Sequence, residues 1–488
     1  MNLTTATNAA NAALATISAE SSVLSRNIAG INNGGSFSRK IANIATTASG
    51  SVALTSITNA QNKALFESVL GATSSSASQS AILAGLTTLQ SAMGDTDSTN
   101  SPSSEISALT SAVQTYEASP SDASLAASVV TAADSLATTL NNASATVQQL
   151  REQTDSQMAS SVSQINSLLS QFQTVNSQIV SATAMGNDVT DLEDTRNTVL
   201  TQLSQQIGIS TTTGANGDMS IYTDSGVTLF QGGRARSVTF QPTSTYTPAT
   251  TGNAVYIDGV AVTGTSATMP IQSGALAGLG NLRDTIAVTY QTQLDQVAQG
   301  LISSFAETDP SGSGTTLAGL FTNAGSTAVP SATSNTGLAG AISVNAAVDP
   351  SQGGNATLLR DGINFTYNTT GAASYSTQLQ QLLTNLSSSQ TFNSAGQIGT
   401  SNSVSGYAGA SASWLNGQLQ SATSESSYQS TLLSNSTTAL SNATGVNLDD
   451  EMSQMLDLEN SYSASSKLLT TINQMFADLT NAINPTAV

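Results

Sequence analysis

The two ends of the chain carry apolar stripes at helical spacing, and each stripe needs a partner to cover it. The N-terminal stripe recurs at alternating intervals of four and three residues, which is the heptad pattern of a coiled coil. It consists of Leu3, Thr7, Ala10, Leu14, Ile17, Ser21, Leu24, Ile28 and Ile31. Its early members are small, so the helix buries little surface per turn and is expected to fray when it stands alone.

The C-terminal stripe mirrors the first. It consists of Leu448, Met452, Met455, Leu458, Tyr462, Leu469, Ile472, Phe476, Leu479 and Ile483, and Pro485 follows it. Asp449, Asp450 and Glu451 fall in the first turn, where carboxylates interact favourably with the helix dipole. A metal cluster is the rival interpretation, but three consecutive side chains point in different directions. We expect the two terminal helices to pair as an α-helical coiled coil.

The middle of the chain changes its period. Helical spacing from about residue 122 to residue 184 predicts a helix roughly 90 Å long if it is continuous. Alternating runs at 217–233 and 254–262, each with a turn signal, predict a small antiparallel β module. Helical spacing returns at 276–307, and the Gly-, Ser- and Asn-rich segment that follows holds the short strand candidates "AISVNAAV" and "GINFTYN".

The predicted fold is mainly α with inserted β modules: paired terminal helices, a long central helix bundle and small antiparallel β domains in the middle. The predicted domains are a terminal coiled-coil domain of residues 1–40 plus 441–488, a long helical domain of residues 41–206 plus 276–307 plus 371–440, a β module of residues 207–275, and an irregular or β outer module of residues 308–370.

Composition excludes several classes of function. A net charge of −19 argues against a nucleic-acid partner, because phosphate binding needs clustered Lys and Arg. The chain has no Cys and no His, so disulfides, thiolate chemistry, Cys/His zinc sites and His-based catalytic triads are excluded. The first residues lack the basic start and apolar run of a secretory signal, and we expect no membrane span. We expect a soluble protein that, if exported, leaves by another route.

We predict no catalytic residues, no metal and no cofactor. Asp191, Glu193 and Asp194 beside Arg196 indicate a surface ion-pair set, because nothing places two of these acids in a dry cleft. A glycosidase-type carboxylate pair stays open among thirty acids, but aromatic platforms for sugars are scarce. Trp414, the single tryptophan, lies in a helical stretch and is expected in the core.

Four stretches resemble the axial proteins of the bacterial flagellum, which include rod, hook and hook-associated proteins. "NIAGINNGGSFSRK" (27–40) looks like the Asn-rich turn that closes the first helix of this family, and "GVNLDDEMSQMLDLENSYSASSKLLTTINQMFADLTNAI" is similar to its C-terminal helix. "DLEDTRNTVLTQLSQQIG", with "GDMSIYTDSGVTLFQGG" after it, and "GNLRDTIAVTYQTQLDQVAQGL" resemble passages on either side of the β module in the hook-associated proteins of the hook–filament junction.

The resemblance implies a non-enzymatic structural subunit that joins the hook to the filament in the extracellular flagellum and is secreted through the flagellum's own channel. The terminal helices would form an inner tube, the long helices a second layer, and the β modules the outer part. Implied partners are copies of the chain itself, hook protein, a second hook–filament junction protein and an export chaperone that holds the C-terminal helix. A flagellin or another filament-type axial protein is one alternative, and a secreted surface adhesin is an alternative of another class.

In this interpretation Asn and Gly end the first helix by tolerating left-handed backbone angles, so that the chain can leave the inner tube. Arg26, Arg39 and Lys40 would face carboxylates or helix C-termini of neighbouring subunits; alternatively they are solvated surface charges. The predicted subunit-interface residues are Leu3, Ala10, Leu14, Ile17, Leu24, Ile28, Ile31, Arg26, Arg39, Lys40, Leu448, Met452, Met455, Leu458, Tyr462, Leu469, Ile472, Phe476, Leu479 and Ile483.

Overall fold

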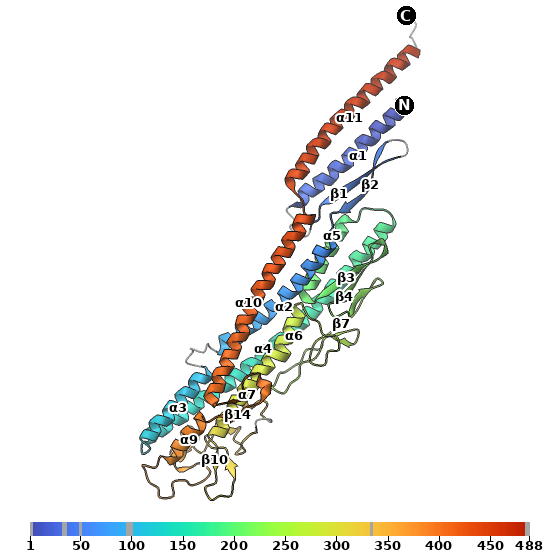
Figure 1. Ribbon diagram of the computed structural model, residues 1–488. Helices are drawn as coiled ribbons and strands as arrows, with labels where there is room; N and C mark the ends of the chain where they lie inside the picture. Colours follow the sequence, from blue (N-terminus) through green and yellow to red (C-terminus); the bar gives the residue numbers. More distant parts are fainter. Residues whose placement is uncertain (1–2, 32–36, 48–50, 94–100, 332–334, 484–488) are drawn as a thin grey trace.

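Helices from both ends and from the middle of the chain run along an elongated molecule, with the N- and C-termini at the same end (Figure 1). The computed structural model describes residues 3–31, 37–47, 51–93, 101–331 and 335–483. Its helices are α1 Leu3–Gly30, α2 Lys63–Met93, α3 Pro102–Ala118, α4 Ala123–Ala184, α5 Thr190–Gln206, α6 Ala275–Asn281, α7 Ala287–Ser304, α8 Leu358–Asp361, α9 Thr377–Ser387, α10 Val404–Thr444 and α11 Leu448–Ile483. The predicted class, mainly α with inserted β modules, is confirmed.

The long rod predicted from residue 122 to residue 184 is confirmed as the single helix α4. Asp122 caps its start by accepting a hydrogen bond from the backbone N–H of Ser124 at 2.8 Å. One face of α4 lines the core near the base of the molecule with α3 and α7, and further along it lines a second core with α5 and the β module. Because α4 spans both cores, it holds the helical part together lengthwise.

By length and composition alone, α4 is also apolar enough to cross a membrane, although no such stretch was expected from the sequence. Its apolar side chains are buried among α3, α5, α6 and α7. A core helix that is covered by its own chain can be equally long and equally apolar, so the packing accounts for the apolar composition of α4.

The predicted β module consists of short antiparallel sheets beside α4. One sheet has the order β3 Ile209–Thr213, β4 Met219–Thr223, β5 Thr228–Gln231 and β6 Arg234–Ala235, and the other has β7 Val238–Thr239, β8 Tyr256–Ile257 and β9 Val260–Ala261. The Asp-Gly turn between β8 and β9 has φ of 47° at Asp258 and 83° at Gly259, as a tight hairpin requires. Both predicted hairpins of this module are confirmed.

A buried ion network fastens the β module to the bundle. A π-helical turn, Leu282–Ile286, joins α6 to α7 and carries the buried Arg283. The Arg283 guanidinium pairs with Asp155 of α4 and with Asp284, and it donates to the carbonyl of Asn253 at 2.8 Å. The Tyr246 hydroxyl also donates to Asp155, at 2.7 Å, and burial raises the pKa of Tyr246 to about 12. The loop that joins β7 to β8 is therefore held by charge-assisted hydrogen bonds.

The segment after α7 forms small strand pairs near the base of the molecule. These are β10 Glu307–Thr308 with β11 Thr316–Leu317, β12 Phe321–Asn323 with β13 Ile342–Val344, and, after α9, β14 Gln390–Thr391 with β15 Ser401–Asn402. The strand candidate "AISVNAAV" contains β13 and is confirmed, whereas "GINFTYN" forms no strand. There the backbone N–H groups of Ile363 and Asn364 donate to the buried Glu307 carboxylate, at 2.8 and 2.6 Å, instead of to a neighbouring strand.

A hairpin that was not predicted follows α1. Strands β1 Lys40–Thr46 and β2 Val52–Asn59 pair antiparallel, although this segment was assigned to the long helical domain. The hairpin packs along α1, and the Thr16 hydroxyl donates to the carbonyl of Val52 at 3.0 Å. The hairpin therefore covers part of the first helix that a lone coiled-coil pair would leave open.

Candidate assembly interface

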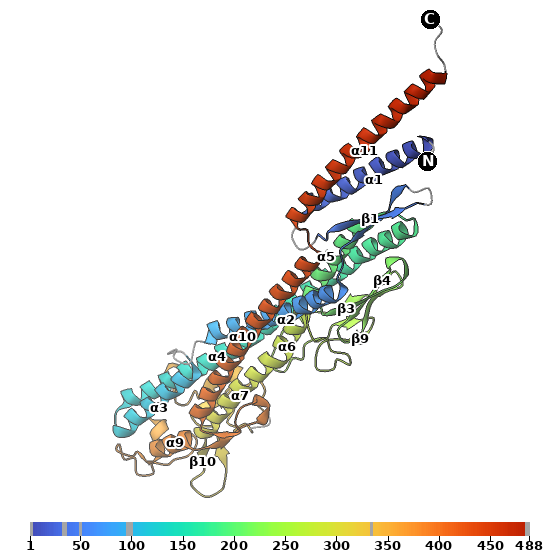
Figure 2. The ribbon, with the colours of Figure 1, turned by 45° about the horizontal axis from the view of Figure 1, so that its top comes forward.

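The two terminal helices lie side by side and antiparallel at one end of the molecule (Figures 1 and 2). The Ser21 hydroxyl donates to the sulfur of Met455 at 3.4 Å, and Asn27 Nδ2 donates to Glu451 Oε2 at 2.9 Å. Predicted stripe residues on the facing sides are buried or half-buried: Leu3, Ala10, Leu14, Ile17, Leu24, Ile28, Met455, Leu458, Leu469, Ile472 and Phe476. The pairing of the terminal helices predicted from these stripes is confirmed.

The remaining apolar side chains of α11 are exposed. They form what we call the flanking set: Leu448, Met452, Leu456, Tyr462, Leu468, Met475 and Leu479, each between 45% and 58% exposed. Of the predicted stripe, Leu448, Met452, Tyr462 and Leu479 belong to this set, Ile31 of α1 is 37% exposed, and the Ile483 side chain lies outside the described part. Leu456, Leu468 and Met475 were missed because they lie off the heptad seam. Counting the large apolar residues outside the heptad positions would have found these three.

The flanking set lies on both sides of the face that contacts α1. At 100° per residue, Met452 and Leu456 fall on one side of the contact face, and Leu468 and Met475 fall on the other. A helix that needs one partner has a single apolar stripe, whereas a helix packed among several neighbours has a wider one. Residues further along α11 extend beyond the start of α1, which accounts for the exposure of Leu479.

The energy available from covering the flanking set is large for a single helix. Fully burying one large aliphatic side chain contributes about 1.5 to 3 kcal/mol, and these seven are about half-exposed. Their burial would therefore contribute roughly 5 to 10 kcal/mol before the cost of ordering the helices. That is enough to drive an assembly of many weak, repeated contacts.

A buried polar node joins the terminal pair to the rest of the molecule. Asn27 donates to Glu451 and to the Lys40 carbonyl at 3.0 Å, and it accepts from the Lys40 backbone N–H at 2.8 Å. The Lys40 ammonium group donates to Asn59 at 2.9 Å, to the Thr190 carbonyl at 3.2 Å and to the Asp194 carboxylate. Asn27, Lys40 and Glu451 are all buried, so each of these bonds is shielded from water.

Two of the basic residues predicted to face neighbouring subunits instead pair within the chain. Arg26 makes ion pairs with Asp188 at 2.8 Å and with Asp191 at 2.9 Å, and the hydrogen bond that Arg26 donates to Asp188 raises the pKa of Arg26. Lys40 pairs with Asp194, as described above. These pairs form because α5 and the turn before it bring acids to the end of α1. A contact of Arg26 or Lys40 with a neighbouring subunit stays a prediction. Arg39 donates its backbone N–H to the carbonyl of Thr444 at 2.8 Å and lines a cavity between the terminal helices.

Of the acids at the start of α5, Asp191 lies on the surface in an ion pair as predicted, but Asp194 does not. Asp194 is buried against Lys40, and burial raises its pKa while Lys40 opposes that shift. Glu193 accepts from Asn59 and Gln61, both at 3.0 Å. Arg196 is buried as well and makes no ion pair with described residues. No local pattern indicated that β2 and the turn after α1 would cover this helix.

The turn after α1 is closed by an aromatic contact. α1 ends at Gly30, and a Cβ atom at that position would lie only 2.5 Å from the Phe37 ring. The Lys40 ammonium group lies 4.7 Å from the centre of the same ring, at cation–π distance. Residues 32–36 of the predicted turn lie outside the described residues. Gly30 is required here for close approach, since no side chain fits against Phe37.

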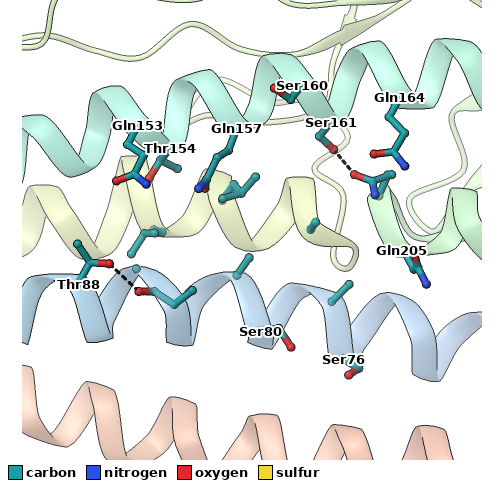
Figure 3. Close-up of a pocket in the computed structure, with 18 of the residues that line it drawn as sticks. Ser76, Ser80, Thr88, Gln153, Thr154, Gln157, Ser160, Ser161, Gln164 and Gln205 are labelled. Carbon is teal, nitrogen blue, oxygen red and sulfur yellow. Dashed lines mark hydrogen bonds between the residues drawn. The ribbon is translucent and has the colours of Figure 1, made fainter.

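A polar groove runs between α2 and α4, with α6 behind it (Figure 3). Its volume is about 690 Å³, and Ser, Thr, Gln, Ala, Gly and Leu residues line it. Figure 3 shows Gln153, Gln157 and Gln164 of α4 across from Ser76 and Ser80 of α2. No titratable side chain lines this groove, so its Ser and Thr hydroxyls have no acid or base in the lining to activate them. Trp414 is partly buried against the core as expected, and it stacks on Tyr290 at 6.5 Å.

Comparison with known families explains this arrangement. Residues 86–326 match the flagellar hook-associated protein FlgK helical domain, and residues 439–482 match the C-terminal domain of the flagellar basal body rod FlgEFG proteins. Together these matches support a flagellar hook-associated protein. The first match covers α3 to α7 and the β module, and the second covers the end of α10 and nearly all of α11. Neither alternative, flagellin or surface adhesin, is favoured by these matches.

Two sequence relatives and one solved structure point to the same family. It is 26% identical over 215 residues to flagellar hook-associated protein 1 of Salmonella typhimurium and, to the same extent, to that of Salmonella typhi. These alignments cover 43% of the chain but only 38% of the length of either relative. The flagellar hook junction protein FlgK from Burkholderia pseudomallei has a similar fold, with a TM-score of 0.57 at 16% identity over 76% of this chain and 99% of that one.

Proposed function

We propose that this chain is a structural, non-enzymatic subunit of the bacterial flagellum that joins the hook to the filament and is required for filament assembly. The observation that carries the proposal is the flanking set on α11, which lies in the segment that matches the axial-protein C-terminal domain. A helix with exposed apolar side chains on both sides of its internal contact is incomplete in a single copy. Neighbouring terminal helices in a tube would complete it.

The proposed partners follow from an axial position. Copies of the chain itself would lie laterally, hook protein would lie below, and a second junction protein would lie above. An export chaperone would hold α11 before secretion, because seven half-exposed apolar side chains are an aggregation hazard in the cell. The location would be the extracellular hook–filament junction, reached through the flagellum's own export channel. The lack of any charged or titratable side chain in the α2–α4 groove supports a structural role.

Deletion of the gene tests this function. The deletion strain should build hooks but no filaments and should release flagellin into the medium, and a plasmid copy of the gene should restore filaments. A deletion strain with intact filaments would refute the assignment. Filaments that are present but fragile would instead point to a stabilising role after assembly.

A further inference from the structure

A buried cation that makes no ion pair with described residues borders the cavity beside α5. Four Lys or Arg side chains of the described chain are at most 4% exposed: Lys40, Arg151, Arg196 and Arg283. Lys40 and Arg283 pair with carboxylates. Arg151 pairs with none, yet it donates to the carbonyls of Arg283, Thr247 and Thr250 and to the Gln148 side chain.

Arg196 differs from the other three. Its Nη1 donates to the carbonyl of Gly217 at 2.7 Å, and its Nε is buried with no hydrogen-bond partner in the described residues. No carboxylate of the described chain lies within ion-pair distance of it, although Glu193 and Asp218 act on it at longer range. Burial lowers the pKa of Arg196, which reflects the cost of keeping this charge away from water. Most of its five N–H donors are therefore unused.

Arg196 borders a cavity of about 170 Å³ that is built from several elements. The walls come from the start of α2, α5, strands β3 and β4, and the end of α10. The titratable groups around it are Lys63 with Glu67, which lie 3.6 Å apart, and Glu193, which already accepts from Asn59 and Gln61. Because the carboxylates that line the cavity already have partners, Arg196 is the group with free capacity.

We propose that this cavity is a carboxylate-binding site in which Arg196 is the principal donor. A guanidinium with unused N–H groups is suited to the two oxygens of a carboxylate, and an added negative charge would compensate the buried cation. The carboxylate can come from an acidic side chain of a neighbouring copy or from a free anion. The neighbouring copy is the source that the charge balance favours, since each chain carries 30 acids and 11 bases. That source rests on the proposed function.

Two variants and two readouts test the site. Arg196→Met keeps the length of the side chain and removes the charge, and Arg196→Lys keeps the charge but loses the planar fork. Arg151→Met is the matched control, because Arg151 is similarly buried but donates four hydrogen bonds. Thermal unfolding of the purified chain is measured first, and retention of the secreted chain on isolated hooks is measured in the deletion strain.

We expect Arg196→Met to leave the melting temperature unchanged or raised, whereas Arg151→Met lowers it. We expect retention on hooks to fall at least tenfold for Arg196→Met and by less for Arg196→Lys. If the source is a free anion, retention will be unchanged, but acetate will raise the melting temperature of the wild type above that in chloride at equal ionic strength, and will not do so for Arg196→Met.

The inference is overturned if Arg196→Met is retained like the wild type and acetate has no effect. It is also overturned if Arg196→Met lowers the melting temperature as much as Arg151→Met, since Arg196 would then be a structural anchor for Gly217. If wild-type chain itself is not retained on hooks, the proposed function fails, and the acetate experiment still decides whether the cavity binds a carboxylate.

Discussion

Replacing Asn27 by Ala should release the terminal helices from the body of the molecule. Asn27 is 1% exposed and bonds three groups: the Lys40 carbonyl, the Lys40 N–H and the Glu451 carboxylate. A buried group left without its partner costs about 1 to 3 kcal/mol, so losing three partners should cost about 3 kcal/mol or more. Asn43→Ala is the matched control, because Asn43 makes two exposed side-chain hydrogen bonds within the hairpin.

The assay is amide hydrogen exchange along α1 and α11, compared between the wild type and both variants. A loss of about 3 kcal/mol should lower protection in the first turns of α11 roughly 100-fold, since each 1.4 kcal/mol is a factor of about ten. Asn43→Ala should change protection by less than about threefold, in keeping with an exposed site. Unchanged protection near Glu451 in Asn27→Ala, or an equal loss in Asn43→Ala, would refute the role given to the node.

Two further predictions concern the helical part. Burial raises the pKa of Asp295 to about 6 from an ordinary value near 3.8. The folded state therefore binds the proton more tightly than the unfolded state does. Stability should fall as the pH rises from about 4 to about 7. The contribution of Asp295 to the free energy of unfolding should drop by roughly 3 kcal/mol over this range. In denaturant titrations, Asp295→Asn should lose this part of the pH dependence. Identical pH profiles for the variant and the wild type would contradict the prediction. Arg283→Met removes the guanidinium that pairs with Asp155 and Asp284, and it should cost about 3 to 5 kcal/mol, measured as a lower melting temperature. Arg236→Met removes an exposed ion pair and should change stability by less than about 1 kcal/mol. Equal effects of these two variants would contradict the anchoring role of the buried network.

Much of the fold was accessible from sequence because periodic patterns report which side of a helix is covered. The spacing of Leu3 to Ile31 and of Leu448 to Ile483 predicted the terminal pair, and the Asp258-Gly259 turn predicted a hairpin. These signals are local. They depend on residues within a few turns of one another, so they can be read without knowing which other segments pack nearby.

The parts that were missed depend on contacts between segments far apart in the chain. The partners of Arg26 and Lys40 come from α5 and from the turn before it, about 150 residues later, and no spacing rule connects them. The failed strand at "GINFTYN" has the same cause, because the Glu307 carboxylate takes the backbone donors that a strand would use. The hairpin after α1 was missed because the segment was assigned to the long helical domain, and its strands pair only with each other.

The most direct test of the account is to remove apolar surface from α11 without disturbing its contact with α1. Met452→Ser, Leu468→Ser and Met475→Ser together replace three side chains of the flanking set that are 49% to 54% exposed. Met185→Ser, Met269→Ser and Val288→Ser form the matched control, since these exposed apolar residues lie elsewhere.

In the deletion strain, the fraction of secreted chain that stays on the hooks is compared with the fraction released into the medium. Each lost side chain should cost about 1 kcal/mol, so the triple variant of α11 should be secreted but retained roughly 100-fold less well, and filaments should fail to form. The control should be retained like the wild type. Retention of the α11 variant at the wild-type level, with normal filaments, would contradict the claim that this helix is completed by its neighbours.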